Sequence, residues 1–233
     1  MIPVDDNIRS WQKPIINYWL IGINLVIFIW EIKLDTTNEL GYLINNLGII
    51  PAQINQAIAN AFLDNSAAWV VVFWRLLSLP VSLFLHGSFS QFLGNLLFLW
   101  VFGKTVEGIL GHKQYLLLYL TAGFFCGIVQ IVLLSDLTTP IIGANGAITS
   151  ILGAYIIKFP QAKIYSVLAL LILYIPVELP VIFYLFWWFI QQLFYGIGSL
   201  NISGSFSFSN VSYWGQFAAL VTGATFMGLR QKH

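Results

Sequence analysis

Residues 84–120 read FLHGSFSQFLGNLLFLWVFGKTVEGILGHKQYLLLYL. The stretch holds parts of two long apolar runs, separated by a short segment that carries Lys104 and Lys113. A helix needs about 20 mainly apolar residues to cross the hydrocarbon core of a bilayer. With its flanking residues, the stretch predicts two successive transmembrane helices, at 83–103 and 115–134.

The composition of the whole chain agrees with a membrane protein. Of its 233 residues, 58% are hydrophobic and 8% are charged, whereas soluble domains carry roughly 25% charged residues. The formal net charge of +1 gives no clustered basic surface, so we expect no nucleic-acid partner. The single cysteine, Cys126, excludes an internal disulfide and a cysteine-based zinc cluster. We expect no metal and no cofactor.

Outward from residues 84–120, further apolar segments predict additional spans. An apolar piece at 164–175 is only about a dozen residues long and precedes two prolines, so we interpret it as interfacial or re-entrant. The connection between Lys33 and Ser78 predicts a long external loop, with an amphipathic interfacial segment that contains Ile54 and Ile58. The predicted spans lie at 15–32, 83–103, 115–134, 145–158, 179–196 and 212–229.

The basic residues favour six crossings over seven. With six, only Lys33 and Arg75 lie on the external side, as the positive-inside rule requires. We therefore predict an all-α membrane protein, a six-helix bundle formed by a single domain, 1–233, in contact with the lipid bilayer. Both termini are expected in the cytoplasm. The absence of a transit-peptide composition favours a bacterial plasma membrane.

Polar residues inside spans are costly, so they mark either function or hydrogen bonds between helices. Gln91 and Asn95 are four residues apart and share one helix face. In GANG, Gly143 to Gly146, small residues open a helix whose free N–H groups can bind an anion or oxyanion, although the same residues also suit close packing and Asn suits a helix cap. Gln216 is the polar tip of a small-residue seam in the last span.

His86 precedes the second span and is the one histidine near these polar residues in the sequence. An imidazole titrates near neutral pH. Two interpretations stay open, a functional group and a hydrogen-bonded structural histidine.

The chain resembles the rhomboid family of intramembrane serine proteases over nearly its whole length. The resemblance rests on several long blocks in the family's order and spacing. They are residues 1–31, the Trp74-Arg75 pair, residues 84–120, IIGANGAITSILGAYIIKFPQAKI (141–164), LPVIFYLFWWFIQQLF (179–194) and YWGQFAALVTG (213–223).

The resemblance implies a catalytic site whose key residues are replaced in this chain. The family's nucleophilic serine, in Gly-x-Ser-Gly, corresponds to Asn145, and its histidine base corresponds to Gln216. The family's oxyanion pair, His-x-x-x-Asn, corresponds to Gln91 and Asn95. A carboxamide is not a usable nucleophile, and glutamine cannot accept a proton near neutral pH.

Three functional hypotheses follow. The first is a rhomboid-like pseudoprotease that binds transmembrane helices of client membrane proteins without cutting them. The second is an active intramembrane serine endopeptidase with a nonstandard site, in which Ser150, Thr149, Ser88 or Ser90 would replace the lost serine. The third, a channel or transporter, is disfavoured because the spans hold few charged residues.

Three structural expectations accompany these hypotheses. Gln91, Asn95, Asn145 and Gln216 are expected to converge on one buried polar cluster. Trp187 and Trp188 in the fifth span are expected either to line a lateral entrance for clients or to anchor the helix at the membrane interface. Ala219, where the family has glycine, is expected to hold the fourth and sixth spans apart.

Overall fold

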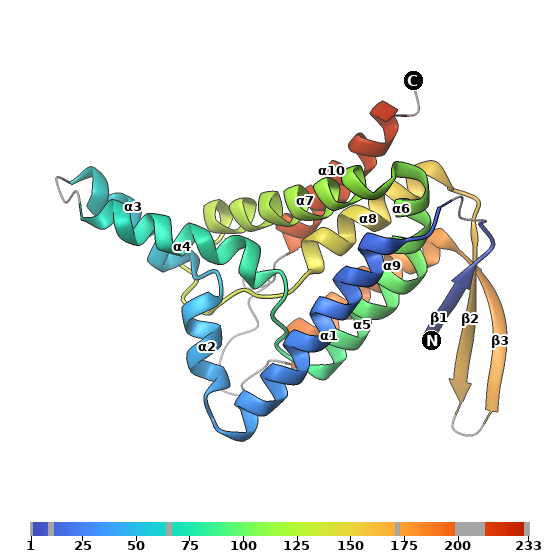
Figure 1. Cartoon of the computed structure of the whole chain (residues 1–233), viewed down its shortest axis with the longest axis horizontal. Helices are drawn as coiled ribbons and strands as arrows, with labels where there is room; N and C mark the ends of the chain where they lie inside the picture. The colour runs from blue at the N-terminus through green and yellow to red at the C-terminus, as the bar shows by residue number, and fades with distance from the viewer. Residues whose placement is uncertain (1, 9–11, 64–66, 171–172, 199–212, 231–233) are drawn as a thin grey trace.

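The computed structural model describes residues 2–8, 12–63, 67–170, 173–198 and 213–230 (Figure 1). It is a helical bundle with a small antiparallel sheet beside it. The elements in chain order are β1 Ile2–Asp6, α1 Ile15–Thr36, α2 Leu40–Leu47, α3 Pro51–Phe62, α4 Ala68–Ser82, α5 Phe89–Phe98, a π-helical segment η1 Leu99–Gly103, α6 Lys104–Leu110, α7 His112–Leu133, α8 Asn145–Lys158, β2 Lys163–Leu170, β3 Leu173–Pro180, α9 Val181–Gly198 and α10 Tyr213–Arg230.

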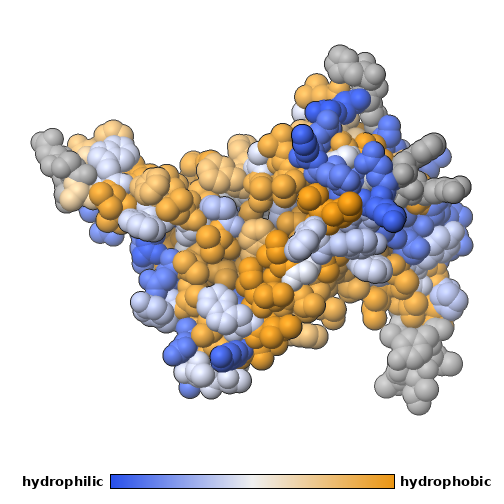
Figure 2. All heavy atoms as spheres, viewed as in Figure 1, coloured by the Kyte–Doolittle hydropathy of each residue, from blue (hydrophilic) through white to orange (hydrophobic). Residues whose placement is uncertain are grey.

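Within the described residues, three helices are long and apolar enough to cross a membrane, Ile15–Thr36, Phe89–Leu110 and His112–Leu133. Figure 2 shows a broad hydrophobic surface over most of one face, with hydrophilic side chains gathered toward its two ends. An apolar belt between two polar ends is the surface that a bilayer requires. The chain is therefore an integral membrane protein.

The second predicted span, 83–103, has the wrong boundaries. Ser88 has extended dihedrals and its side chain accepts a hydrogen bond from the Gln91 N–H, which makes it the N-cap of α5. The helix therefore starts at Phe89, and it continues through η1 and α6 to Leu110. The expected extension to residue 83 falls instead in the turn between α4 and α5.

The π-helical segment is held by polar side chains from two other helices. The Asn17 side chain on α1 donates to the Leu99 carbonyl over 2.9 Å, and the Tyr115 hydroxyl on α7 donates to the Asn17 carboxamide oxygen over 2.7 Å. A Cβ at Gly103 would clash with the Asn17 side chain. A carbonyl that the irregular helix turn leaves available is thereby satisfied without water.

The fold is mostly helical, as predicted, but it is not all-α, because β1, β2 and β3 form a three-stranded antiparallel sheet in that order. The apolar piece at 164–175, interpreted as interfacial or re-entrant, belongs to the β2–β3 hairpin. A hairpin pairs backbone groups that a short irregular segment would leave unsatisfied in lipid. It also returns the chain to its starting level, where the Val181 N–H bonds to the Ala162 carbonyl over 3.0 Å.

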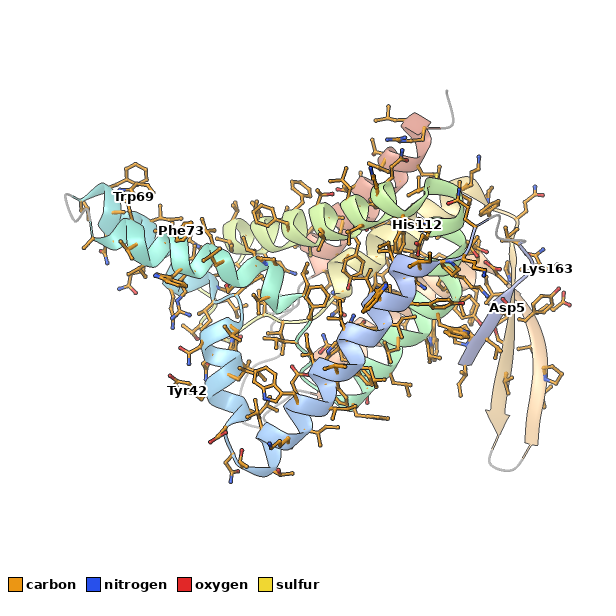
Figure 3. All side chains as sticks on the ribbon, viewed as in Figure 1. Asp5, Tyr42, Trp69, Phe73, His112 and Lys163 are labelled. Carbon is orange, nitrogen blue, oxygen red and sulfur yellow. The ribbon has the colours of Figure 1, made fainter. Side chains whose placement is uncertain are left out.

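The connection that was predicted as an external loop contains α2, α3 and α4, and α3 and α4 form an arm that projects from the bundle (Figure 1). The predicted amphipathic segment is α3, in which Ile54 is fully buried and Phe62 is exposed. Trp69 and Phe73 on α4 lie on the arm and are also exposed (Figure 3).

At the centre of the bundle, α8 is buried against α7 and α10. A Cβ at Gly223 on α10 would clash with the Ser150 carbonyl oxygen, and a Cβ at Gly153 on α8 would clash with the Leu220 carbonyl oxygen. The two helices therefore cross in backbone contact, and the expectation that Ala219 holds them apart is wrong. Two glycines permit the close approach although Ala219 is itself fully buried between the helices.

We predict that Gly223→Ala destabilises the protein by about 1–3 kcal/mol, because the added methyl group overpacks the crossing. At roughly 2–4 °C per kcal/mol for a chain of this size, the melting temperature falls by about 2–12 °C. Gly228→Ala on the same helix is the matched control, since nothing lies within 4 Å of its Cβ position. Thermal unfolding in detergent measures both variants, and equal melting temperatures would contradict the backbone contact.

Candidate functional site

The site begins where Asn145 opens α8, directly after a sharp turn at Gly143. Gly143 has a φ of 110°, which L side chains rarely adopt, and a Cβ there would also clash with the Gln91 side chain. The Gly143 N–H donates to the Ser82 carbonyl over 2.8 Å. A glycine is thus required at this position by both conformation and space.

Gln91 fixes this turn from α5. Its side-chain nitrogen donates to the Ile142 carbonyl over 3.3 Å, and its side-chain oxygen accepts from the Gly87 N–H over 2.9 Å. Both ends of the carboxamide therefore hold main-chain groups. The residue at the family's oxyanion-histidine position links the start of α5 to the start of α8.

Asn95 lies one helical turn further along α5 and is buried. Its side-chain nitrogen makes no hydrogen bond to the residues that the structure describes. A buried N–H donor without a partner costs about 1–3 kcal/mol. The donor is therefore poised to bind a polar ligand or water.

Gln216 on α10 is buried, and its side-chain oxygen accepts a hydrogen bond of 3.2 Å from the Trp188 indole N–H on α9. The Trp188 ring is buried too and packs edge-on against Phe98 of α5, with 4.6 Å between ring centroids. Trp188 therefore connects the family's base position to two further helices. The apolar run LFWWF gave no signal for this contact, because every residue in it is bulky and apolar.

The two tryptophans of α9 differ in environment, although the sequence analysis treated them alike. Trp187 is half-buried and stacks on Phe183, with an interplanar angle of 10°. Trp188 points into the bundle, where it reaches Gln216. Trp187 is the one of the pair that an approaching segment can touch.

The expected convergence of Gln91, Asn95, Asn145 and Gln216 on one cluster stays a prediction. Gln91 bonds to main-chain atoms beside Asn145, and Gln216 bonds to an indole. In these hydrogen bonds, neither glutamine bonds to another of the four carboxamide side chains.

A cavity of about 50 Å³ lies beside the start of α8. Asn145, Gly143 and Gly146 line it from one side, and Cys126 and Gln130 line it from α7. A space of this size holds about one or two water molecules. The Gln130 side chain donates to the Cys126 sulfur over 3.4 Å. The sequence analysis did not place Cys126 at the site, and only the contacts between helices reveal it.

The hydroxyl groups near the site are engaged with the backbone. Ser150 donates to the Ala147 carbonyl over 2.6 Å, and Thr149 donates to the Asn145 carbonyl over 2.5 Å. Ser88 caps α5. None of these hydrogen bonds involves an imidazole or a carboxylate, so they do not form a nucleophile and base arrangement.

His86 is buried between the rings of Phe28 and Phe92, at 5.9 and 5.3 Å between centroids. Burial lowers the pKa of His86 to about 4, so the imidazole is neutral at neutral pH. Its backbone N–H donates to the Glu31 carboxylate over 2.8 Å. His112 lies at the start of α7 and contacts Glu107 over 2.5 Å. The His112 ring therefore contacts a carboxylate, whereas His86 contacts one through its backbone N–H.

The model of the Rhomboid domain family matches residues 71–232, which include all the candidate site residues. The presenilin-associated rhomboid-like protein A, mitochondrial, of Danio rerio is 34% identical over 40% of this chain and 25% of its own length. The corresponding Homo sapiens protein is 30% identical over 48% of this chain and 29% of its own length.

The rhomboid protease GluP of Bacillus subtilis (strain 168) is 34% identical over 61% of this chain and 24% of its own length. The matched regions thus span about a quarter to under a third of these curated relatives. Since the family model covers more than half of the sequence, the chain belongs to the rhomboid family.

Proposed function

We propose that the chain is a catalytically inactive rhomboid-like protein that binds transmembrane segments of client membrane proteins. The observation that carries the proposal is the pair of carboxamides, Asn145 and Gln216, at the positions of the family's nucleophile and base. Loss of nucleophile or base from a serine protease costs on the order of 10⁶ in turnover. A protein that keeps the residues that pack this fold, but lacks the catalytic ones, can still bind transmembrane segments.

The seam between α5 and α9 is the proposed client-binding surface. Phe98 of α5 and Trp188 of α9 close it from inside, while Trp187 and the exposed Phe186 present aromatic rings outside. A client helix in lipid gains from van der Waals packing and from polar partners at the contact. The Asn95 side-chain nitrogen, on α5, is a donor suited to that second role.

An active intramembrane serine endopeptidase is the alternative, favoured by the 34% identity to a rhomboid protease. In that case a hydroxyl such as Ser150 would have to leave its main-chain acceptor and find a base. Ion flux in liposomes would test the disfavoured channel reading.

We also propose six spans, a largely external α2–α4 region, and both termini in the cytoplasm of a bacterial cell. The bond from Val181 to Ala162 supports this count, because the hairpin between α8 and α9 returns to its starting side and adds no crossing. Reporter fusions to each terminus measure the orientation. Opposite locations for the two ends would exclude an even number of spans.

We predict that a fluorophosphonate probe labels no serine of the purified protein. The reason is that the serine and threonine hydroxyls beside Asn145 donate to main-chain oxygens and have no described base. Mass spectrometry of the labelled protein in detergent measures the result. A stoichiometric adduct on any serine would replace the proposal with the protease alternative.

We predict that Asn145→Ser with Gln216→His yields little proteolysis. Trp188 donates to the side chain at position 216, so it would occupy the acceptor nitrogen of the new imidazole. The lost oxyanion donor at Gln91 costs a further ~10²–10³ in rate. Adding Gln91→His and Trp188→Phe should raise cleavage of a transmembrane substrate in liposomes. Robust cleavage by the double variant alone would show that neither obstacle matters.

We predict that Trp187→Ala weakens client crosslinking at least severalfold with little loss of folded yield, because the half-buried ring stacks only at the helix surface. Trp188→Ala is the contrast variant. It removes a buried ring and its hydrogen bond, at a cost of about 3–5 kcal/mol. Photo-crosslinking and size-exclusion yield measure both effects. If client crosslinking and folded yield fell together for Trp187→Ala, anchoring of the helix at the membrane interface would be the better explanation of that residue.

A further inference from the structure

The three-stranded sheet is fastened to both helices that form the proposed client seam. Its first strand, β1, packs along α5 and η1, and its middle strand, β2, reaches α9 through Ser166. The sheet pairs β1 with a segment about 160 residues later in the sequence, since Ile2 lies opposite Val167. The sheet therefore connects α5 to α9 independently of the direct contacts between those helices.

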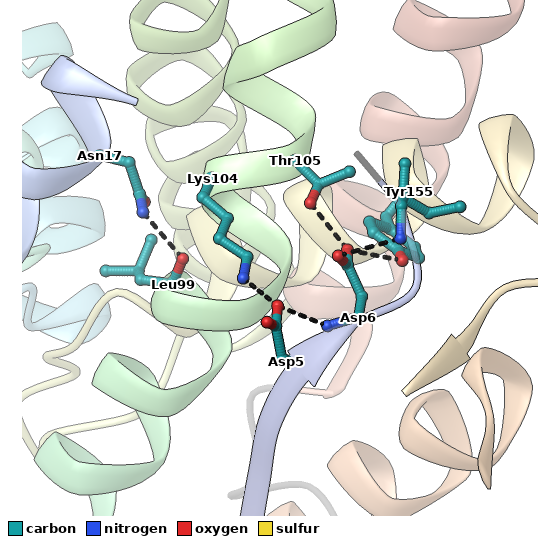
Figure 4. A network of polar contacts seen from close by, with 8 residues as sticks. Asp5, Asp6, Asn17, Leu99, Lys104, Thr105 and Tyr155 are labelled. Atoms are coloured by element: carbon teal, nitrogen blue, oxygen red, sulfur yellow. Dashed lines mark hydrogen bonds and ion pairs between the residues drawn. The ribbon is translucent and has the colours of Figure 1, made fainter. Parts of the chain in front are cut away.

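The β1 attachment consists of charged and hydroxyl groups (Figure 4). Asp6 is buried, and its carboxylate accepts hydrogen bonds from the Thr105 hydroxyl of α6 over 2.7 Å and from the Tyr155 hydroxyl of α8 over 2.8 Å. Asp5 pairs with Lys104 at the surface. Hydrogen bonds to a carboxylate are among the stronger ones in proteins, so Asp6 with its two buried bonds is the main fastening.

The β2 attachment is the contact between the Ser166 and Tyr184 hydroxyls. Tyr184 of α9 is fully buried. Its ring centroid lies 5.9 Å from that of Phe102 and 6.5 Å from that of Phe98. Ser166 therefore contacts α9 at Tyr184, whose ring packs on the inner side of the seam. A movement of α9 away from α5 has to break this contact or carry β2 with it.

The sheet lies beside a helix that is long enough to span the membrane. Asp6 bonds to Thr105 of α6. β1 also contacts η1 and α5, which precede α6 in the chain. Beyond β1 the hairpin of β2 and β3 has strands of eight residues, which reach about 26 Å at about 3.3 Å per residue. The ladder satisfies the backbone of β2, the middle strand, on both sides.

The outer edge of the sheet is protected against pairing with another strand. β3 is the outer strand, and it carries Pro176 and Pro180, which have no backbone N–H. Prolines on an edge strand block further strand addition. The sheet is therefore built to connect elements of its own chain.

We propose that β1 is a latch that holds α9 against α5 and so controls access to the seam. The inference rests on the proposed function, because it assigns a regulatory element to the same client surface. While β1 is paired, β2 keeps Ser166 on Tyr184 and α9 stays in place. When β1 separates, the hairpin loses one neighbour and α9 is free to move away from α5.

The latch is releasable because β1 is an edge strand of five residues that pairs with β2 alone in the sheet. Short elements with few partners open at a lower free-energy cost than the global unfolding of the protein. The pair of Asp5 and Lys104 lies at the surface, where solvent weakens its contribution. Opening of β1 therefore depends chiefly on Asp6.

A cross-strand disulfide tests the latch by adding a constraint. Ile2 and Val167 are directly opposite in the antiparallel ladder, at a Cα separation of about 4.5–5.5 Å that a disulfide bridges. The native Cys126 is buried and does not compete. The expected result for Ile2→Cys with Val167→Cys is that α9 amide hydrogens exchange at least about fivefold more slowly in the oxidised than in the reduced protein.

The matched control is Tyr165→Cys with Glu178→Cys, which links β2 to β3 at another directly opposed pair and leaves β1 free. Oxidation of this control should leave α9 exchange unchanged. Asp6→Asn, which weakens the fastening without a crosslink, should accelerate it. Equal α9 exchange in the oxidised and reduced forms of the first variant, or an equal slowing in the control, would overturn the latch.

Client capture separates this inference from the proposed function. A photo-reactive residue at position 187 should capture fewer client segments when the Ile2→Cys, Val167→Cys protein is oxidised, and normal capture should return on reduction. Slower α9 exchange with no capture in either redox state would support the latch and reject α9 as the client surface. Slower α9 exchange with equal capture in both redox states would overturn the control of access. Unchanged exchange would reject the latch whatever the capture result.

Discussion

Polar groups at membrane depth gain most from partners within the protein, because lipid offers them none. The π-helical turn depends on the Asn17 side chain to satisfy Leu99, and the start of α1 depends on Glu107, whose carboxylate accepts from the backbone N–H groups of Ile16 and Asn17 at 2.9 and 2.6 Å. Each contact joins segments about 80 to 90 residues apart. Since lipid offers these groups no hydrogen-bond partner, the contacts help to determine how the helices are placed.

The same constraint explains what the carboxamides do where the family has catalytic groups. A carboxamide can donate and accept at once. Gln91 uses both capacities on the turn before α8, and Gln216 accepts from Trp188. A side chain that acts on a substrate needs hydrogen-bonding capacity that is free for the substrate. A side chain that stabilises the fold uses that capacity on other groups of the protein. Both glutamines use their side chains to hold other parts of the fold, whereas the Asn95 side-chain nitrogen makes no hydrogen bond among the described residues.

The sequence predicted those parts of the structure that depend on neighbouring residues. The apolar runs located α1 and α7 closely, and the GANG turn was placed at the mouth of a helix. The sheet was missed because β1 pairs with a strand some 160 residues away, and no local pattern carries that information. The bond between Trp188 and Gln216 was missed for a related reason. A run of bulky apolar residues sets no register, so only packing decides which tryptophan points inward.

Trp188 couples the altered site to the proposed client surface. Its ring packs on Phe98 of α5 while its N–H holds Gln216 of α10. In a protease of this fold, the side chain at position 216 has to accept a proton from the nucleophile. Here its oxygen accepts from an indole on α9, so the former base position helps to hold α9 in place. Under the proposed function, glutamine at the position of the family's base holds the helix that clients would meet, where a histidine would transfer a proton.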